Sequence, residues 1–140
     1  MYSNANHTLT KKERACILVI KNSDRNSFPI RVSELAEAMH VKPPTVEELL
    51  HRLENKKMIE RNRGMIILTE KGREIYSKII MIHRILETFF VDCGVSIDDA
   101  CAEASNFDYM INDTTAKLIL IKLGNPVNCP HGMKIQEGSD

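Results

Sequence analysis

Residues 32–68 read VSELAEAMHVKPPTVEELLHRLENKKMIERNRGMIIL, and the organisation of the first half of the chain can be worked out from them. Apolar residues recur at helical spacing before and after Val41, which predicts two helices separated by a tight turn. Ser33 is the expected N-cap of the first helix, and Pro43 and Pro44 fall in the first turn of the second, where proline is tolerated. Two helices in this order are typical of a helix-turn-helix, whose second helix enters the major groove of DNA.

The segment after the second helix predicts a β-hairpin. MIE (residues 58–60) and MIIL (65–68) are short β-prone runs joined by RNRG, and Gly64 can adopt the positive φ that a hairpin turn favours. A hairpin after a helix-turn-helix is a wing, whose basic residues can meet phosphate or the minor groove. We expect the DNA contacts to come from the second helix and the wing, at Lys42, Pro44, Thr45, Glu48, Arg52, Arg61 and Arg63.

Helices are expected on both sides of this segment. TKKERACILVIKN (residues 10–22) predicts a helix with Thr10 as its N-cap. KGREIYSKIIMIHRILETFFVDCG (71–94) predicts a long helix whose apolar face suggests a dimer seam. SIDDACAEASNFDYMIND (96–113) and TTAKLILIKLG (114–124) predict two more, the first of them capped by its initial serine.

Together these elements predict a mostly α fold with a small β-hairpin wing. We expect an N-terminal winged helix-turn-helix domain at residues 1–74 and a helical domain at residues 75–140.

The charge of the chain is unevenly distributed, although the total is zero. Residues 1–78 hold 15 Lys and Arg against 10 Asp and Glu, whereas residues 79–140 hold 4 against 9. The basic excess of the first half favours DNA as its partner, although winged helices also form protein-binding modules. Glu47 and Glu48, early in the second helix, either complement its dipole or accept a hydrogen bond from cytosine, and the sequence leaves both open.

The composition, 43% hydrophobic and 27% charged over 140 residues, is that of an ordinary globular protein. No apolar run reaches the roughly 18 residues of a membrane span, and the polar start MYSNANHTLTKKER has no signal-peptide core. We therefore expect a cytoplasmic protein without a membrane partner. Its four cysteines, which have no disulfide-framework spacing, are expected to be reduced thiols: Cys16, Cys93, Cys101 and Cys129.

Three segments of the second half carry candidate metal ligands. His83 and Glu87 stand four residues apart on the long helix, so their side chains share a face, an arrangement that more often makes a surface hydrogen bond. Cys101 lies on the next helix, where the alternative is a small buried hydrophobe. Cys129 and His131 lie in NPVNCPHG (125–132), where proline and glycine exclude a helix, and are either incidental or half of a site.

The sequence resembles the diphtheria-toxin-repressor and manganese-transport-regulator family of metal-dependent transcriptional repressors. The resemblance covers about residues 10–132, in VSELAEAMHVKPPTVEELLHRLENKKMIERNRGMIILTEKGREIY, HRILE, GVSIDDACAEASNFDYMIND and GNPVNCPHG. It implies a winged helix-turn-helix, a helical dimerisation and metal-binding domain, and operator binding by homodimers in response to a divalent metal. Longer members add an SH3-like third domain, for which we expect no residues in this chain.

The resemblance also implies which residues bind metal. One family site maps onto a complete ligand set in this chain: His83, Glu87, Cys101, Cys129 and His131. The tail pair would then fold back onto the long helix and close a single site with Cys101.

A second family site maps onto Arg14, Ser105, Asp108 and Tyr109, of which arginine cannot bind a cation and tyrosine is a poor substitute for histidine. We therefore expect this second site to be lost or altered, with Ser105 and Asp108 as weaker candidate ligands and an Arg14 to Asp108 contact in place of the metal.

Two thiolates, two imidazoles and a carboxylate suit Fe(II) or Zn(II) better than Mn(II), which prefers oxygen ligands. The leading interpretation is a metal-dependent repressor that binds double-stranded operator DNA as a homodimer. An alternative is a metal-independent or thiol-redox-responsive regulator with a structural zinc, and another is a protein-interaction module with structural zinc. An enzyme with a small-molecule substrate is not expected, because the chain has no Gly-rich phosphate loop or recognisable substrate site.

Overall fold

The computed structural model describes residues 9–25 and 28–136, which form two compact units. The N-terminal unit comprises residues 9–76 and the C-terminal unit residues 77–136. Six helices and one two-stranded sheet occur among the described residues, which confirms the predicted mostly α fold with a β-hairpin. None of the described helices combines the length and hydropathy that crossing a membrane requires. The first eight residues, part of the polar start, lie outside the described range.

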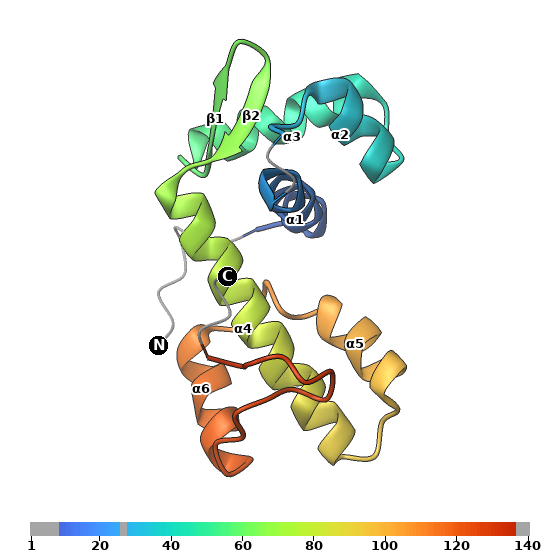
Figure 1. Ribbon diagram of the computed structural model, residues 1–140, viewed down its shortest axis with the longest axis vertical. Coiled ribbons are helices and arrows are strands. Elements are labelled where there is room, and N and C mark those ends of the chain that lie inside the picture. Colours follow the sequence, from blue (N-terminus) through green and yellow to red (C-terminus); the bar gives the residue numbers. More distant parts are fainter. Residues whose placement is uncertain (1–8, 26–27, 137–140) are drawn as a thin grey trace. The chain divides into compact units, whose positions relative to one another are not determined.

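The N-terminal unit contains the predicted winged helix-turn-helix (Figure 1). Its helices are α1 (Lys11–Arg25), α2 (Val32–Met39) and α3 (Pro43–Asn55). His40, in the left-handed conformation at φ 56°, ends α2 and turns the chain toward α3. The three helices and the hairpin share a core in which the largest side chains are fully buried: Ile17, Ile20, Leu35, Leu49, Leu50, Leu53, Met58, Ile66 and Leu68.

The helix starts are set by local hydrogen bonds. Thr10 caps α1 as predicted, because its Oγ1 accepts from the Glu13 N–H at 3.1 Å while Glu13 Oε1 accepts from the Thr10 N–H at 2.8 Å. The prediction of Ser33 as the N-cap of α2 is wrong, since the helix begins at Val32 and Arg31 is the N-cap. The Arg31 N–H donates to Glu34 Oε1 at 3.2 Å, which satisfies one amide at the start of this helix.

The wing is a hairpin with a two-residue turn between β1 (Ile59–Asn62) and β2 (Met65–Leu68). The strands pair antiparallel, with Asn62 opposite Met65. Its turn residues Arg63 and Gly64 both have positive φ, 52° and 79°, as the turn that matches the twist of a hairpin requires. The Ile66 N–H donates to the Ile30 carbonyl at 2.9 Å, so the strand is also tied to the segment before α2.

The C-terminal unit is built on the long helix α4 (Glu70–Asp92), which begins in the N-terminal unit. It also contains α5 (Ile97–Ser105), α6 (Asp113–Lys122) and a tail loop, residues 124–136. The helix predicted over residues 96–113 is shorter than expected, because α5 ends at Ser105 and Asp108 follows in a turn. The core of the unit joins α4, α5, α6 and the tail loop through Ile82, Ile85, Leu86, Ala104, Ala116, Leu120, Cys129 and Ile135.

Candidate metal centre and DNA-binding surface

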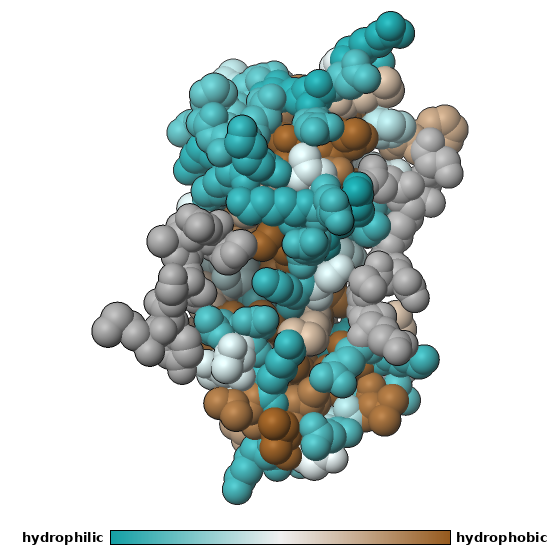
Figure 2. All heavy atoms as spheres, turned by 90° about the vertical axis from the view of Figure 1, so that its left-hand side faces the viewer, coloured by the Kyte–Doolittle hydropathy of each residue, from teal (hydrophilic) through white to brown (hydrophobic). Residues whose placement is uncertain are grey.

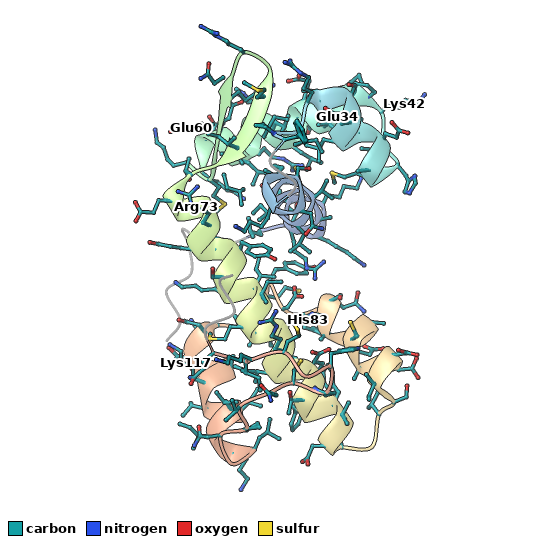
Figure 3. The ribbon with its side chains drawn as sticks, in the orientation of Figure 1. Glu34, Lys42, Glu60, Arg73, His83 and Lys117 are labelled. Carbon is teal, nitrogen blue, oxygen red and sulfur yellow. The ribbon has the colours of Figure 1, made fainter. Side chains whose placement is uncertain are left out.

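Helix α4 brings two of the predicted ligands together. His83 lies on α4 in the C-terminal unit (Figure 3). Its Nε2 is 3.7 Å from Oε2 of Glu87, one helical turn further along α4. Glu87 is only 3% exposed, a degree of burial that is rare for a carboxylate. A buried carboxylate beside an imidazole is suited to binding a cation.

Cys101 completes a group of three ligands with this pair. Its Sγ lies 3.5 Å from His83 Nε2, so the thiol of α5 faces the imidazole of α4. Together the ligand atoms of His83, Glu87 and Cys101 lie within 4.8 Å of one another.

The tail loop supplies a second group of three that also contains Glu87. His131 Nδ1 is 3.2 Å from Glu87 Oε2, and Cys129, His131 and Glu87 offer ligand atoms within 4.8 Å of one another. The structure therefore brings the other four predicted ligands, from three segments, around the carboxylate of Glu87. The ligand atoms form two overlapping groups that share Glu87, whereas the sequence suggested a single set of five around one cation.

Backbone hydrogen bonds hold the tail loop in the shape that presents this pair. The Cys129 N–H donates to the Met133 carbonyl at 2.8 Å, and the Gly132 N–H donates to the Cys129 carbonyl at 2.8 Å. Arg84 Nη1 donates to the Lys134 carbonyl at 2.7 Å, which ties the loop to α4 at the residue after His83. The sequence analysis missed Arg84, because nothing in the local pattern tells a loop-binding arginine from a solvated one.

The weaker candidates Ser105 and Asp108 contact ligand residues but belong to neither group of ligands. Ser105 Oγ donates to the Cys101 carbonyl at 3.1 Å. Asp108 is fully buried, and its Oδ2 is 3.0 Å from His83 Nδ1, the ring nitrogen on the other side from Cys101. The predicted Arg14 to Asp108 contact stays a prediction, since Arg14 belongs to the N-terminal unit, and Tyr109 is half-buried.

The donor geometry fits a transition-metal ion. Metal bonds of 2.0–2.3 Å to nitrogen, oxygen and sulfur in a tetrahedron put the ligand atoms about 3.3–3.8 Å apart. The separations of 3.5 Å, 3.7 Å and 3.2 Å around His83 and Glu87 are close to these values. Burial raises the pKa of the Cys129 thiol, and its hydrogen bond to Glu87 raises it further. Metal binding at Cys129 must therefore release a proton.

Helix α3 presents most of its predicted DNA contacts to solvent. Lys42, Pro44, Glu48 and Arg52 are exposed, and Thr45 is half-buried. At the tip of the wing Arg63 is exposed too.

Arg61 is placed differently from Arg63. Its guanidinium lies 2.7 Å from Glu47 Oε2 and 2.9 Å from Glu54 Oε1, and its side chain is 25% exposed. These two ion pairs join the wing to α3. Glu47 thus pairs with Arg61, a role that differs from both the helix-dipole and the cytosine-binding explanation.

Two family models match the chain. A model described as the iron dependent repressor, metal binding and dimerisation domain matches residues 69–137, and the MarR family model matches residues 25–64. The first match contains all five candidate ligands, and the second contains the helix-turn-helix with the first strand of the wing.

Curated relatives are named as transcriptional regulators, in agreement with the prediction that this chain is not an enzyme. An uncharacterised HTH-type transcriptional regulator of Aeropyrum pernix is 31% identical over 72% of this chain and 57% of its own length. The regulator MntR of Geobacillus kaustophilus is 31% identical over 59% of each chain. The iron-dependent repressor IdeR of Mycobacterium tuberculosis is 28% identical over 76% of this chain and 47% of its own. The chain thus spans roughly half to three fifths of the length of these relatives.

Solved structures share the fold over nearly the whole chain. The hypothetical protein SSo2273 from Sulfolobus solfataricus superposes with a TM-score of 0.83 at 27% identity, over 91% of this chain and 98% of that one. A manganese-dependent transcriptional repressor in complex with manganese superposes with a TM-score of 0.73 at 28% identity, over 88% of this chain and 57% of that one. Residues 69–137 thus match the iron dependent repressor family model, and the chain as a whole is similar to regulators of the diphtheria-toxin-repressor and manganese-transport-regulator family.

Proposed function

We propose that this chain is a metal-dependent, DNA-binding transcriptional repressor that acts as a homodimer. The observation that carries the proposal is the convergence of His83, Cys101 and the tail pair on buried Glu87, in the same chain as a winged helix-turn-helix. The names of the relatives, among them an iron-dependent repressor and a manganese-dependent one, support it.

The donor set supports iron or zinc as the metal more than manganese. Two thiols are soft ligands that suit Fe(II) or Zn(II), whereas Mn(II) favours sites made of oxygen ligands. The half-exposed side of the centre, at His131 and Cys101, would leave room for the ion to exchange with solution.

In the proposed mechanism Glu87, His83, Cys101 and the tail pair would hold the ion, which would keep α5 and the tail loop on α4. Helix α4 continues into the N-terminal unit, so this constraint acts on the helix that leads to the DNA-binding elements. In a dimer the spacing of the two recognition helices must match operator half-sites about one helical turn apart or a multiple of it. Fixing the ligand segments would therefore favour one spacing and raise operator affinity.

The surface of the C-terminal unit supports the homodimer. Hydrophobic side chains gather on this unit in the lower part of Figure 2. Its large apolar side chains that are more than half exposed are Met110, Leu118, Ile121, Val127 and Met133. Exposed apolar side chains gathered on one unit are candidates for an interaction surface.

The proposal is tested by metal content and DNA binding on the same preparation. Elemental analysis of the purified protein gives the metal, and the binding of duplexes selected from a random pool is measured before and after chelation, with Fe(II), Zn(II) or Mn(II) added back. We expect chelation to abolish specific binding and Fe(II) or Zn(II) to restore it. Binding that survives chelation but is lost with peroxide would replace this function by the thiol-redox regulator. An absence of salt-dependent DNA binding would replace it by a protein-interaction module.

A further inference from the structure

The fully buried carboxylate of Asp108 contacts His83 at the ring nitrogen that faces away from the other candidate ligands. Asp108 Oδ2 lies 3.0 Å from His83 Nδ1, while His83 Nε2 faces Cys101 Sγ at 3.5 Å and Glu87 Oε2 at 3.7 Å. The two ring nitrogens of His83 therefore have different partners, a carboxylate on one side and candidate ligands on the other.

This arrangement selects one tautomer of the imidazole. An ionised carboxylate only accepts hydrogen bonds, so a neutral His83 bonded to Asp108 must carry its proton on Nδ1. The lone pair of Nε2 is then directed toward Cys101 and Glu87, as binding of a cation between these side chains requires.

A backbone hydrogen bond positions the main chain of Asp108. The Asp108 N–H donates to the Ala104 carbonyl at 2.9 Å, which continues the last turn of α5 past its end at Ser105. Ala104 is itself fully buried in the core of the C-terminal unit. The backbone of Asp108 is thus anchored to the end of the helix that carries Cys101.

We infer that Asp108 is a positioning residue of the metal centre: it binds no metal, and it fixes the tautomer and ring orientation of His83 so that Nε2 binds a divalent transition metal. This inference rests on the proposed function for the identity of the ligand site. Carboxylates that orient ligand histidines through the second nitrogen typically change metal affinity about 10- to 100-fold when they are removed.

The first test is made on the metal-free protein and does not depend on metal binding. Nitrogen-15 NMR of the histidine rings, at a pH where the imidazoles are neutral, reports which nitrogen of His83 carries the proton. We expect the Nδ1–H tautomer in the wild type and a mixture in Asp108→Asn, because an asparagine amide can either accept from or donate to Nδ1. A wild-type His83 protonated on Nε2 would overturn the inference even if metal binds tightly.

The second test measures affinity with Co(II) and Zn(II) alone, by absorption titration and chelator competition. We expect Asp108→Asn to weaken both affinities about 10- to 100-fold while the stoichiometry stays that of the wild type. Asp98→Asn, at an exposed position in the first turn of α5, is the matched control and should bind like the wild type. Wild-type affinity in Asp108→Asn would overturn the positioning role, and loss of stoichiometry would make Asp108 a ligand instead. A wild type that binds no metal would remove the proposed function, and the NMR result would still decide the tautomer.

Discussion

At the scale of single residues the four cysteines have different environments. Cys16 is fully buried in the N-terminal unit, where burial raises its pKa to about 12, with Glu13 adding to the rise. Cys93 is exposed, whereas Cys101 and Cys129 face the candidate metal centre. Since the thiolate is the reactive form, Cys16 is inert at neutral pH and serves the core alone.

The environment of Cys16 predicts how stability depends on alkaline pH. A raised pKa in the folded state means that its stabilising effect is complete below pH 9 and is lost as pH rises from 9 to about 12. In that window only the unfolded state loses the proton, so the free energy of unfolding should fall by about 1.4 kcal/mol per pH unit from this group. Denaturant unfolding of the wild type and of Cys16→Ala between pH 8 and 10.5 measures the difference in slope. Parallel curves for the two proteins would show that Cys16 does not contribute.

At the scale of secondary-structure elements the wing depends on its turn. Arg63 combines an exposed cationic side chain with a positive φ of 52°, a conformation that alanine adopts only with strain. Replacing this residue by alanine would therefore change both the charge and the hairpin. Asn-Gly is the preferred pair for such a turn, so Arg63→Asn removes the charge and keeps the hairpin.

Arg63→Asn should weaken binding to all DNA sequences about equally and lower the salt dependence by the contribution of roughly one phosphate contact. Fluorescence anisotropy with specific and random duplexes over a range of salt concentrations measures both quantities. Lys78→Gln, which removes an exposed cation of α4 outside the wing, is the control. An unchanged salt slope would exclude the tip of the wing from the DNA interface.

The ion pairs of Arg61 concern two elements, β1 and α3. Glu47→Gln should leave the wing in place, because Glu54 still holds the guanidinium at 2.9 Å, and an exposed pair contributes at most about 1 kcal/mol to stability. Because α3 is proposed to face the DNA backbone, loss of the negative charge of Glu47 should at the same time tighten DNA binding at low salt. Equilibrium unfolding and anisotropy titrations measure the two effects, with Glu103→Gln in α5 as the control for lost charge. Weaker DNA binding by Glu47→Gln would instead assign Glu47 to base recognition.

The same elements show what could be predicted from the sequence. Apolar periodicity and turn residues predicted the helices and the hairpin, because these features depend on neighbours a few positions away. The prediction of Ser33 as N-cap was wrong because α2 begins one residue earlier, at Val32. The ion pairs of Arg61 were missed because they join residues 7 and 14 positions apart in the sequence. The Asp108 to His83 contact was missed because it follows from where α5 ends and how it packs on α4.

At the scale of the whole chain, the C-terminal unit is held together by apolar packing that includes one of the proposed ligands. Cys129 and Ile135 belong to the same core cluster as Ile82 and Leu86 of α4. The tail loop is therefore docked by its core residues, and the proposed ligands add to a contact that already exists. Metal should accordingly stabilise a folded protein without being required for folding.

A metal that binds only the folded chain raises its free energy of unfolding, and we expect this rise to depend on the tail pair. At a concentration 100 times the Kd a ligand adds about 2.7 kcal/mol to the free energy of unfolding. We expect Zn(II) to raise the Tm of the wild type and to raise that of the double variant Cys129→Ser, His131→Ala much less, because one of the two ligand groups around Glu87 is gone. The matched control, Cys93→Ser with His51→Ala, removes an exposed thiol and an exposed imidazole outside the site and should respond like the wild type. Thermal unfolding with and without Zn(II) measures all three proteins. An equal rise in the tail variant would separate the tail loop from the metal centre, and the ion would then depend on α4 and α5 alone.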